Sequence, residues 1–138
     1  MKKDVLLVHA AGNSNQDNDT TDNFPNDSYK KNPAKKASNW LEIGALDWKG
    51  ETNAPARFSN YGKNNVDVFA PGVDIYATWP DNGYNAISGT SMASPACAGV
   101  AAALRSYFPA LSAADVREII MESSTKLDWD VLLPGQEE

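Results

Sequence analysis

The sequence predicts an α/β fold in which a mostly parallel sheet is flanked by helices, and three observations lead to this prediction. Residues 5–10 form a short, nearly continuous apolar run, which is typical of a strand buried on both faces of a parallel sheet. Apolar side chains recur at helical spacing in residues 96–108. A second helix is indicated after Ser112, where a capping pattern precedes further apolar positions.

Length and composition limit what the chain can be. Its 138 residues suffice for one domain with a core of moderate size. The formal charge of −6 argues against a nucleic-acid partner, because phosphate-binding surfaces are basic. No apolar run approaches the roughly 20 residues that cross a bilayer, so we expect no membrane span. Cys97 is the only cysteine, which excludes an internal disulfide, and we expect it to be buried.

Residues 15–36, which follow the first predicted strand, are predicted to form a long surface loop. They are polar, rich in Asn, Asp and Lys, and contain two prolines. Carboxylates in this loop could supply oxygen ligands to calcium, but they show no regular ligand spacing. We therefore prefer a solvated loop and expect no cofactor. The four carboxylates concerned are Asp17, Asp19, Asp22 and Asp27.

Four further strands are predicted from apolar runs and the turn residues between them. Residues 40–46 should form the next strand of the sheet. Residues 66–70 and 73–79 should form two short strands, bent apart by the Pro-Gly pair between them. A turn at residues 81–83 then leads into residues 84–88, the strand that precedes the first helix.

The two predicted helices differ in composition. Small side chains lie between the apolar positions of residues 96–108, as expected for a buried helix against which neighbouring backbone packs closely. Pro95 is expected in its first turn, where a missing N–H is tolerated. Ser112 should cap the second helix, with Asp115 in the capping-box position. The predicted inner face of this helix consists of Val116, Ile119 and Ile120.

The stretch Gly89-Thr90-Ser91-Met92-Ala93-Ser94-Pro95 joins the last predicted strand to the first helix. A serine hydroxyl is a weak nucleophile, so a catalytic serine needs a base and a rigid turn that directs its oxygen at the substrate. Gly89 permits such a turn, and a helix that starts after it would direct unpaired N–H groups at the charge formed in acyl transfer. Ser91 is therefore our candidate nucleophile. Alone, the stretch also fits an ordinary capped helix start.

A second polar segment, Ala10-Ala11-Gly12-Asn13-Ser14, directly follows the first predicted strand. His9 precedes it and is the only histidine of the chain. We interpret His9 as a hydrogen-bonded structural residue, because a histidine on a buried strand is rarely placed to act as a base.

Together, these motifs resemble those of the subtilisin-like serine peptidases, or subtilases. Subtilases carry their nucleophile in Gly-Thr-Ser-Met-Ala-Ser-Pro and an oxyanion-binding asparagine in Ala-Ala-Gly-Asn. Residues 40–45, 58–62 and 68–72 also match family segments in order and spacing, so the resemblance covers about Val5 to Lys126. It implies a partial three-layer subtilisin-like fold. One departure is Ala96-Cys97 after Pro95, where the family usually has His-Val.

The resemblance implies roles for seven residues of a serine endopeptidase that cleaves polypeptides through an acyl-enzyme. Ser91 would be the nucleophile, and the Asn13 side-chain amide and the Ser91 backbone N–H would bind the oxyanion. The substrate-binding residues that it implies are Ala10, Ala11, Gly12, Gly89 and Thr90.

The Ser-His-Asp mechanism also needs a histidine base and a carboxylate that orients it. The family's Asp-Thr-Gly and His-Gly-Thr-His segments do not occur in this sequence. We therefore expect residues 1–138 to be the carboxyl-terminal portion of a subtilase catalytic domain, with the amino-terminal strands missing, and to be inactive alone. Two alternatives are a degenerate homologue that acts as a binding module and an autonomous hydrolase that uses His9.

Two further expectations follow. If the strand at residues 5–10 has lost a neighbour, its free edge should recruit another chain, so we predict self-association. Because subtilases are mostly exported, the full-length protein is expected to be secreted or periplasmic.

Overall fold

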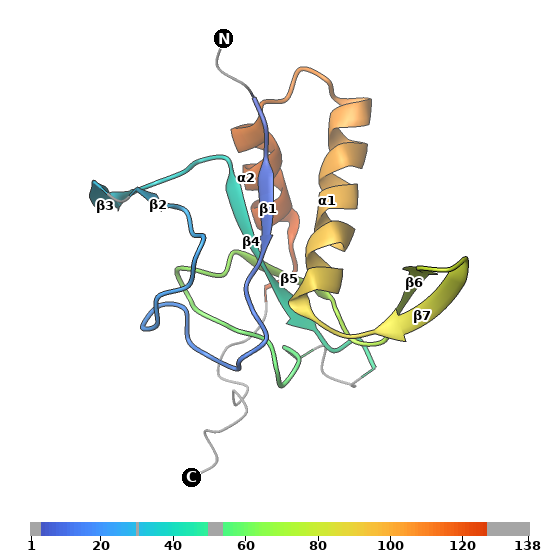
Figure 1. Cartoon of the computed structure of the whole chain (residues 1–138). Coiled ribbons are helices and arrows are strands. Elements are labelled where there is room, and N and C mark those ends of the chain that lie inside the picture. The colour runs from blue at the N-terminus through green and yellow to red at the C-terminus, as the bar shows by residue number, and fades with distance from the viewer. Residues whose placement is uncertain (1–3, 30, 50–53, 127–138) are drawn as a thin grey trace.

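The computed structural model describes residues 4–29, 31–49 and 54–126 and confirms the α/β class (Figure 1). Its main sheet has three parallel strands in the order β1-β4-β5. Two helices share one hydrophobic core with this sheet. The bounds of these five elements are Leu7–Ala10 for β1, Trp40–Leu46 for β4, Val68–Pro71 for β5, Thr90–Tyr107 for α1 and Ala113–Ser123 for α2.

Strand β4 is the centre of the sheet, and its bounds are those predicted from the sequence. Leu41, Ile43 and Ala45 occupy every second position of the strand, so they point to the same face of the sheet, and all three are fully buried. Their partners in the core include Ala93 and Cys97 of α1. Small side chains on this face of α1 let the helix pack closely on the sheet. Burial raises the pKa of the Cys97 thiol, and the charge of the nearby Asp67 adds to this effect.

Helix α1 begins six residues earlier than predicted, at Thr90. Ser91 therefore lies inside the first turn, and Pro95 lies in the second turn rather than the first. The periodic apolar pattern starts later because residues 90–95 are mostly small or polar. The prediction that α1 is buried is correct for one face only, since Val100 is 55% exposed and Tyr107 is 82% exposed.

Two antiparallel hairpins flank the main sheet (Figure 1). The first is formed by β2 (Ser28–Tyr29) and β3 (Asn32–Lys36), so the prediction of a loop throughout residues 15–36 is wrong there. The second is formed by β6 (Ile75–Trp79) and β7 (Gly83–Ile87), and it projects away from the sheet. Positive φ angles at Asp81 and Asn82 give it the turn type that suits the twist of two strands.

Two other predictions need correction at single residues. Strand β1 is not buried on both faces, because Leu7 is 46% exposed and the other three residues of the strand are only partly buried. The capping box of α2 forms between Ser112 and Asp115 as predicted, but Ile119 is exposed while its neighbour Ile120 is buried. No helix in the described part of the chain has the length and apolar character needed to cross a membrane.

Candidate active site

The loop after β1 and the first turn of α1 are joined through Asn13 and Thr90. The Asn13 Oδ1 atom accepts hydrogen bonds from the Thr90 backbone N–H and from the Thr90 hydroxyl, both at 2.9 Å. Thr90 is buried, and its Oγ1 also accepts a hydrogen bond of 3.2 Å from the backbone N–H of Gly12. Two motifs that are 77 residues apart therefore meet at the start of α1.

These hydrogen bonds determine how the Asn13 amide is oriented. A backbone N–H can only donate, so Oδ1 must face Thr90 and Nδ2 must point away from it. Nδ2 lies beside Gly89, at 3.4 Å from the position that a Cβ atom would take there. Among the described residues, Nδ2 has no hydrogen-bond acceptor. The side chain of Asn13 is thus held through its oxygen, while its donor group stays available.

Ser91 is the second residue of α1 and is exposed to solvent. Its backbone N–H belongs to the first helical turn, whose donors have no partner within the helix. Within the described residues this N–H has no acceptor, whereas those of Met92 and Ala93 both donate to the Gly89 carbonyl. The positive end of the helix dipole adds to the field at this end of α1. A hydroxyl and a free backbone donor therefore share one residue, which directly follows the threonine that holds Asn13.

The remaining predicted site residues line the same junction. Ala10 ends β1, and Ala11 is fully buried, with its carbonyl accepting from the side-chain amides of Asn18 (3.1 Å) and Asn23 (2.9 Å).

Gly12 has a φ of 108°, which side chains rarely allow, and a Cβ atom there would lie 2.6 Å from the Asn60 amide nitrogen. No larger residue fits at position 12 without movement of Asn60.

Asn60 is a residue of this junction that sequence reasoning missed. Its Oδ1 accepts from the backbone N–H groups of Ser14 (2.9 Å) and Gln16 (3.2 Å), and its own backbone N–H donates to the Gly12 carbonyl (2.8 Å). Its Nδ2 donates to Asn18 at 3.0 Å, and both asparagines are buried. The only sequence signal was the position of Asn60 within residues 58–62, one of the segments that match the subtilases.

His9 is a hydrogen-bonded structural residue, as predicted. Its Nδ1 lies 2.9 Å from Oε1 of the buried Glu42, and Trp40 donates to the other oxygen of this carboxylate at 2.7 Å. The His9 and Trp40 rings lie close together, with centroids 5.0 Å apart. No hydrogen bond joins His9 to Ser91 in the described part of the chain. The single histidine is therefore engaged with Glu42 rather than with the serine.

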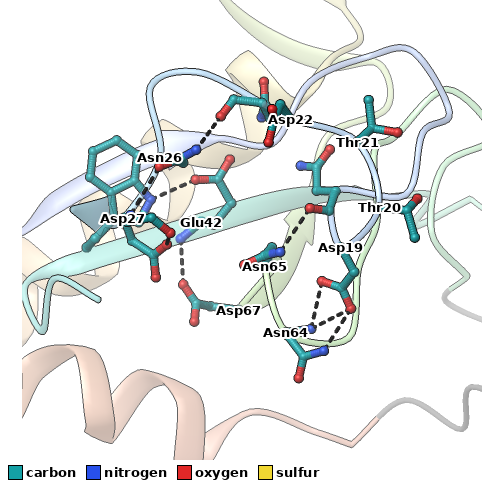
Figure 2. Close-up of a pocket in the computed structure, with 14 residues that line it drawn as sticks. Asp19, Thr20, Thr21, Asp22, Asn26, Asp27, Glu42, Asn64, Asn65 and Asp67 are labelled. Atoms are coloured by element: carbon teal, nitrogen blue, oxygen red, sulfur yellow. Dashed lines mark hydrogen bonds between the residues drawn. The ribbon is translucent and has the colours of Figure 1, made fainter. Parts of the chain in front are cut away.

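A polar pocket lies between the loop of residues 18–28 and the segment before β5, and it shares Asn18 and Asn23 with the junction (Figure 2). Most of its carboxylates are engaged with other groups of the protein: Asp19 accepts from Asn64 at 3.1 Å, and Asp27 lies 3.2 Å from the Lys36 ammonium, whereas Asp22 has no partner among the described residues. Asp67 receives a hydrogen bond from Arg117. Over the described residues, no group of three His, Cys, Asp or Glu side chains is placed to hold a metal ion.

The chain is similar to a known family and to known proteins. The model of the subtilase family matches residues 1–136. Subtilisin DY of Bacillus licheniformis is 37% identical over 124 residues, which are 89% of this chain and 40% of that protein. Subtilisin Savinase of Lederbergia lenta is 37% identical over 123 residues, with the same two shares.

Solved structures show the same likeness. A cold-adapted subtilisin-like serine proteinase has a TM-score of 0.69 and 34% identity, and the match covers 88% of this chain and 39% of that one. The prenylagaramide maturation protease PagA has a TM-score of 0.72 and 30% identity, over 91% of this chain and 42% of that one.

The motifs and the fold place the chain among the serine peptidases. More specifically, it belongs to the subtilase family. The chain spans about two fifths of the length of several of the relatives that it matches.

Proposed function

We propose that the protein that carries this chain is a serine endopeptidase, with Ser91 as the nucleophile and Asn13 as a donor to the oxyanion. The observation that carries this proposal is the fixed orientation of Asn13, whose Oδ1 is bound by Thr90 while Nδ2 has no acceptor among the described residues. The backbone N–H of Ser91 also has no acceptor among the described residues. Two preorganised donors beside a serine hydroxyl are what acyl transfer requires.

In the proposed reaction, the Ser91 oxygen attacks the carbonyl carbon of the scissile peptide bond, and its proton passes to a base. The carbonyl oxygen becomes an oxyanion that receives hydrogen bonds from Asn13 Nδ2 and the Ser91 N–H. Collapse of this intermediate breaks the C–N bond, and the base returns the proton to the leaving amine. Water then hydrolyses the acyl-enzyme by the same steps. The polypeptide would lie against Ala10, Ala11, Gly12, Gly89 and Thr90.

The base and its orienting carboxylate would come from polypeptide outside these 138 residues. Support for this comes from His9, the single histidine, which is engaged with Glu42. The reaction needs no cofactor, because its groups are all side chains, backbone and water. We further propose that the full-length protein is secreted or periplasmic, as most subtilases are.

Labelling with a fluorophosphonate, which phosphonylates activated serines, tests the proposal. The gene product expressed with its flanking reading frame should be labelled at Ser91, and the 138-residue chain alone should not. Ser91→Ala should abolish labelling. Ser94→Ala is the matched control, because the Ser94 hydroxyl belongs to the same motif but donates to the Val8 carbonyl at 3.3 Å. A longer product that stays unlabelled would favour a non-catalytic binding module.

Replacement of the oxyanion donor gives a second measurement. In the gene product expressed with its flanking reading frame, Asn13→Leu should lower kcat by about a hundredfold or more while KM changes little. A loss of this size is known for the corresponding donor in subtilisin itself. An unchanged kcat would show that Asn13 does not bind the oxyanion.

A further inference from the structure

We propose that the buried Asn18 is a positioning residue, which acts on the oxyanion donor Asn13 through a continuous series of hydrogen bonds and therefore rests on the proposed function of Asn13. Every member of this hydrogen-bond series accepts a hydrogen bond on one side and donates one on the other. The members lie within residues 11–90 and are, in order, the Asn60 amide, the Asn18 amide, the Ala11–Gly12 peptide, the Thr90 hydroxyl and the Asn13 amide.

The series begins at Asn60, whose amide is oriented by two backbone donors. Its Oδ1 accepts from the N–H groups of Ser14 and Gln16, so its Nδ2 must face the other way. There it donates to Asn18 Oδ1 at 3.0 Å, which leaves Asn18 Nδ2 to donate to the Ala11 carbonyl at 3.1 Å. Both asparagines are buried, so water has little access to these hydrogen bonds.

The Ala11–Gly12 peptide carries the series across to the start of α1. A trans peptide directs its C=O and its N–H to opposite sides. The C=O of this peptide accepts from Asn18 and also from Asn23, at 2.9 Å, while its N–H donates to Thr90 Oγ1 at 3.2 Å. The Thr90 hydroxyl in turn donates to Asn13 Oδ1 at 2.9 Å. The series therefore ends at Asn13 Nδ2, which has no acceptor among the described residues.

This arrangement strengthens the last donor of the series. Hydrogen bonds that run head to tail polarise one another, by about 10–30% per bond. A group that accepts at one end becomes a better donor at the other, so Asn18 increases the strength of the hydrogen bond that Asn13 gives to the oxyanion. That charge develops only in the transition state, so the effect should appear in kcat rather than in KM.

Steady-state kinetics of the gene product expressed with its flanking reading frame tests the proposal. Asn18→Ala removes the amide that donates to the Ala11 carbonyl, and it should lower kcat about threefold to tenfold while KM stays within about twofold. Active sites are counted by fluorophosphonate titration, so that unfolded molecules do not affect kcat. Asn65→Ala is the matched control, because Asn65 holds the backbone carbonyl of Asn18 at 2.9 Å but is not a member of the series. Its kcat should stay near the wild-type value.

A double substitution separates positioning from general support of the fold. In the Asn13→Leu background the series no longer ends at the oxyanion, so Asn18→Ala should lower kcat no further. A loss that persists in this background would overturn the proposal, as would an unchanged kcat in Asn18→Ala or equal losses in Asn18→Ala and Asn65→Ala. These outcomes leave the proposed role of Asn13 intact, whereas an unchanged kcat in Asn13→Leu alone would overturn both.

If circular dichroism shows that Asn18→Ala does not fold, Asn23→Ala decides. It removes the other side-chain donor to the Ala11 carbonyl and should also lower kcat, with no further loss in the Asn13→Leu background. An unchanged kcat, or a loss that is the same in both backgrounds, would show that hydrogen bonds to this carbonyl do not reach the oxyanion donor.

Discussion

The junction that carries Asn13 and the hairpin that leads to Ser91 are built in opposite ways. At the junction, Asn60 and Thr90 are buried, and each makes several hydrogen bonds to groups that are distant in sequence. On the β6–β7 hairpin, large side chains are exposed, and Tyr76 and Tyr84 stack on each other at 5.6 Å with no core beneath them. The junction is held in place by hydrogen bonds between buried polar groups, whereas the hairpin is held by its own turn and by the hydrogen bonds between its two strands.

This difference shows what positions the serine. The hairpin strand β7 ends at Ile87, but the residue that fixes the start of α1 is Gly89, whose N–H donates to the Gly72 carbonyl at 2.8 Å. A Cβ atom at Gly72 would lie 2.9 Å from the Gly89 carbonyl oxygen, so the two glycines touch backbone to backbone. The hairpin connects these two anchored points. We therefore expect the site to depend on the junction and to tolerate changes in the hairpin.

The largest effect is expected from Asn60→Ala. The substitution leaves the N–H groups of Ser14 and Gln16 without their acceptor inside the protein, at a cost of about 3 kcal/mol in the free energy of unfolding. Urea denaturation of the chain measures this. Asn85→Ala, at an exposed asparagine of β7, is the matched control and should change stability by less than about 0.5 kcal/mol. Equal losses in the two variants would contradict the comparison.

A smaller effect is expected from Thr90→Val, which keeps the shape of the side chain. It removes the hydroxyl that donates to Asn13 and accepts from Gly12, at a cost of about 1–2 kcal/mol. Thr90→Ser should recover most of this loss. The NMR signals of the Asn13 side-chain amide should shift in the valine variant and stay near their wild-type positions in the serine variant. Unchanged signals in both variants would mean that the Thr90 hydroxyl does not orient Asn13.

The parts of the fold that were predicted correctly depend on local pattern. The bounds of β4 were correct because this central strand is apolar almost throughout, and all its residues between the two ends are buried. The cap of α2 was correct because Ser112 and Asp115 are three residues apart and satisfy each other. Hydrophobic periodicity and capping residues depend on residues that are close in sequence, so such elements can be predicted from the sequence alone.

The parts that were missed depend on contacts between distant segments. Asn60 lies 46 residues from Ser14, and nothing in either segment alone shows that they meet. The early start of α1 has the same cause, because the N–H of Thr90 finds its acceptor in a side chain 77 residues away. The β2–β3 hairpin was missed because polar, proline-containing sequence is typical of loops. For the site, the sequence motifs indicated which residues meet but not what holds them.

Removal of the aromatic stack tests the other half of the comparison. Tyr84→Ser abolishes the contact with Tyr76 on an exposed face, so the free energy of unfolding should change by no more than about 0.5 kcal/mol. The Asn13 amide signals should also be unchanged, since the hairpin does not contact Asn13 through any described hydrogen bond. A shift of these signals would show that the hairpin does help to position the junction.

The smallest effect is expected at the base of the hairpin, where the Lys49 ammonium binds the Asp74 carboxylate. The hydrogen bond and charge of Lys49 lower the pKa of Asp74 below its ordinary value. A carboxyl whose pKa is lower in the folded state stabilises the fold above its ordinary pKa, and this contribution is lost as the pH falls through the lowered value. Both groups are exposed, so solvent screens the interaction.

Lys49→Ala should therefore raise the pKa of Asp74 towards its ordinary value, which NMR titration of the carboxyl carbon measures. Its stability should fall slightly at neutral pH and match that of the wild type at acidic pH, where Asp74 is protonated in both proteins. A pKa that does not move would mean that the ion pair is absent in solution. A loss of stability as large as that of Thr90→Val would instead make the hairpin base a second anchor of Gly89, because Asp74 also receives the Ser88 hydroxyl just before that glycine.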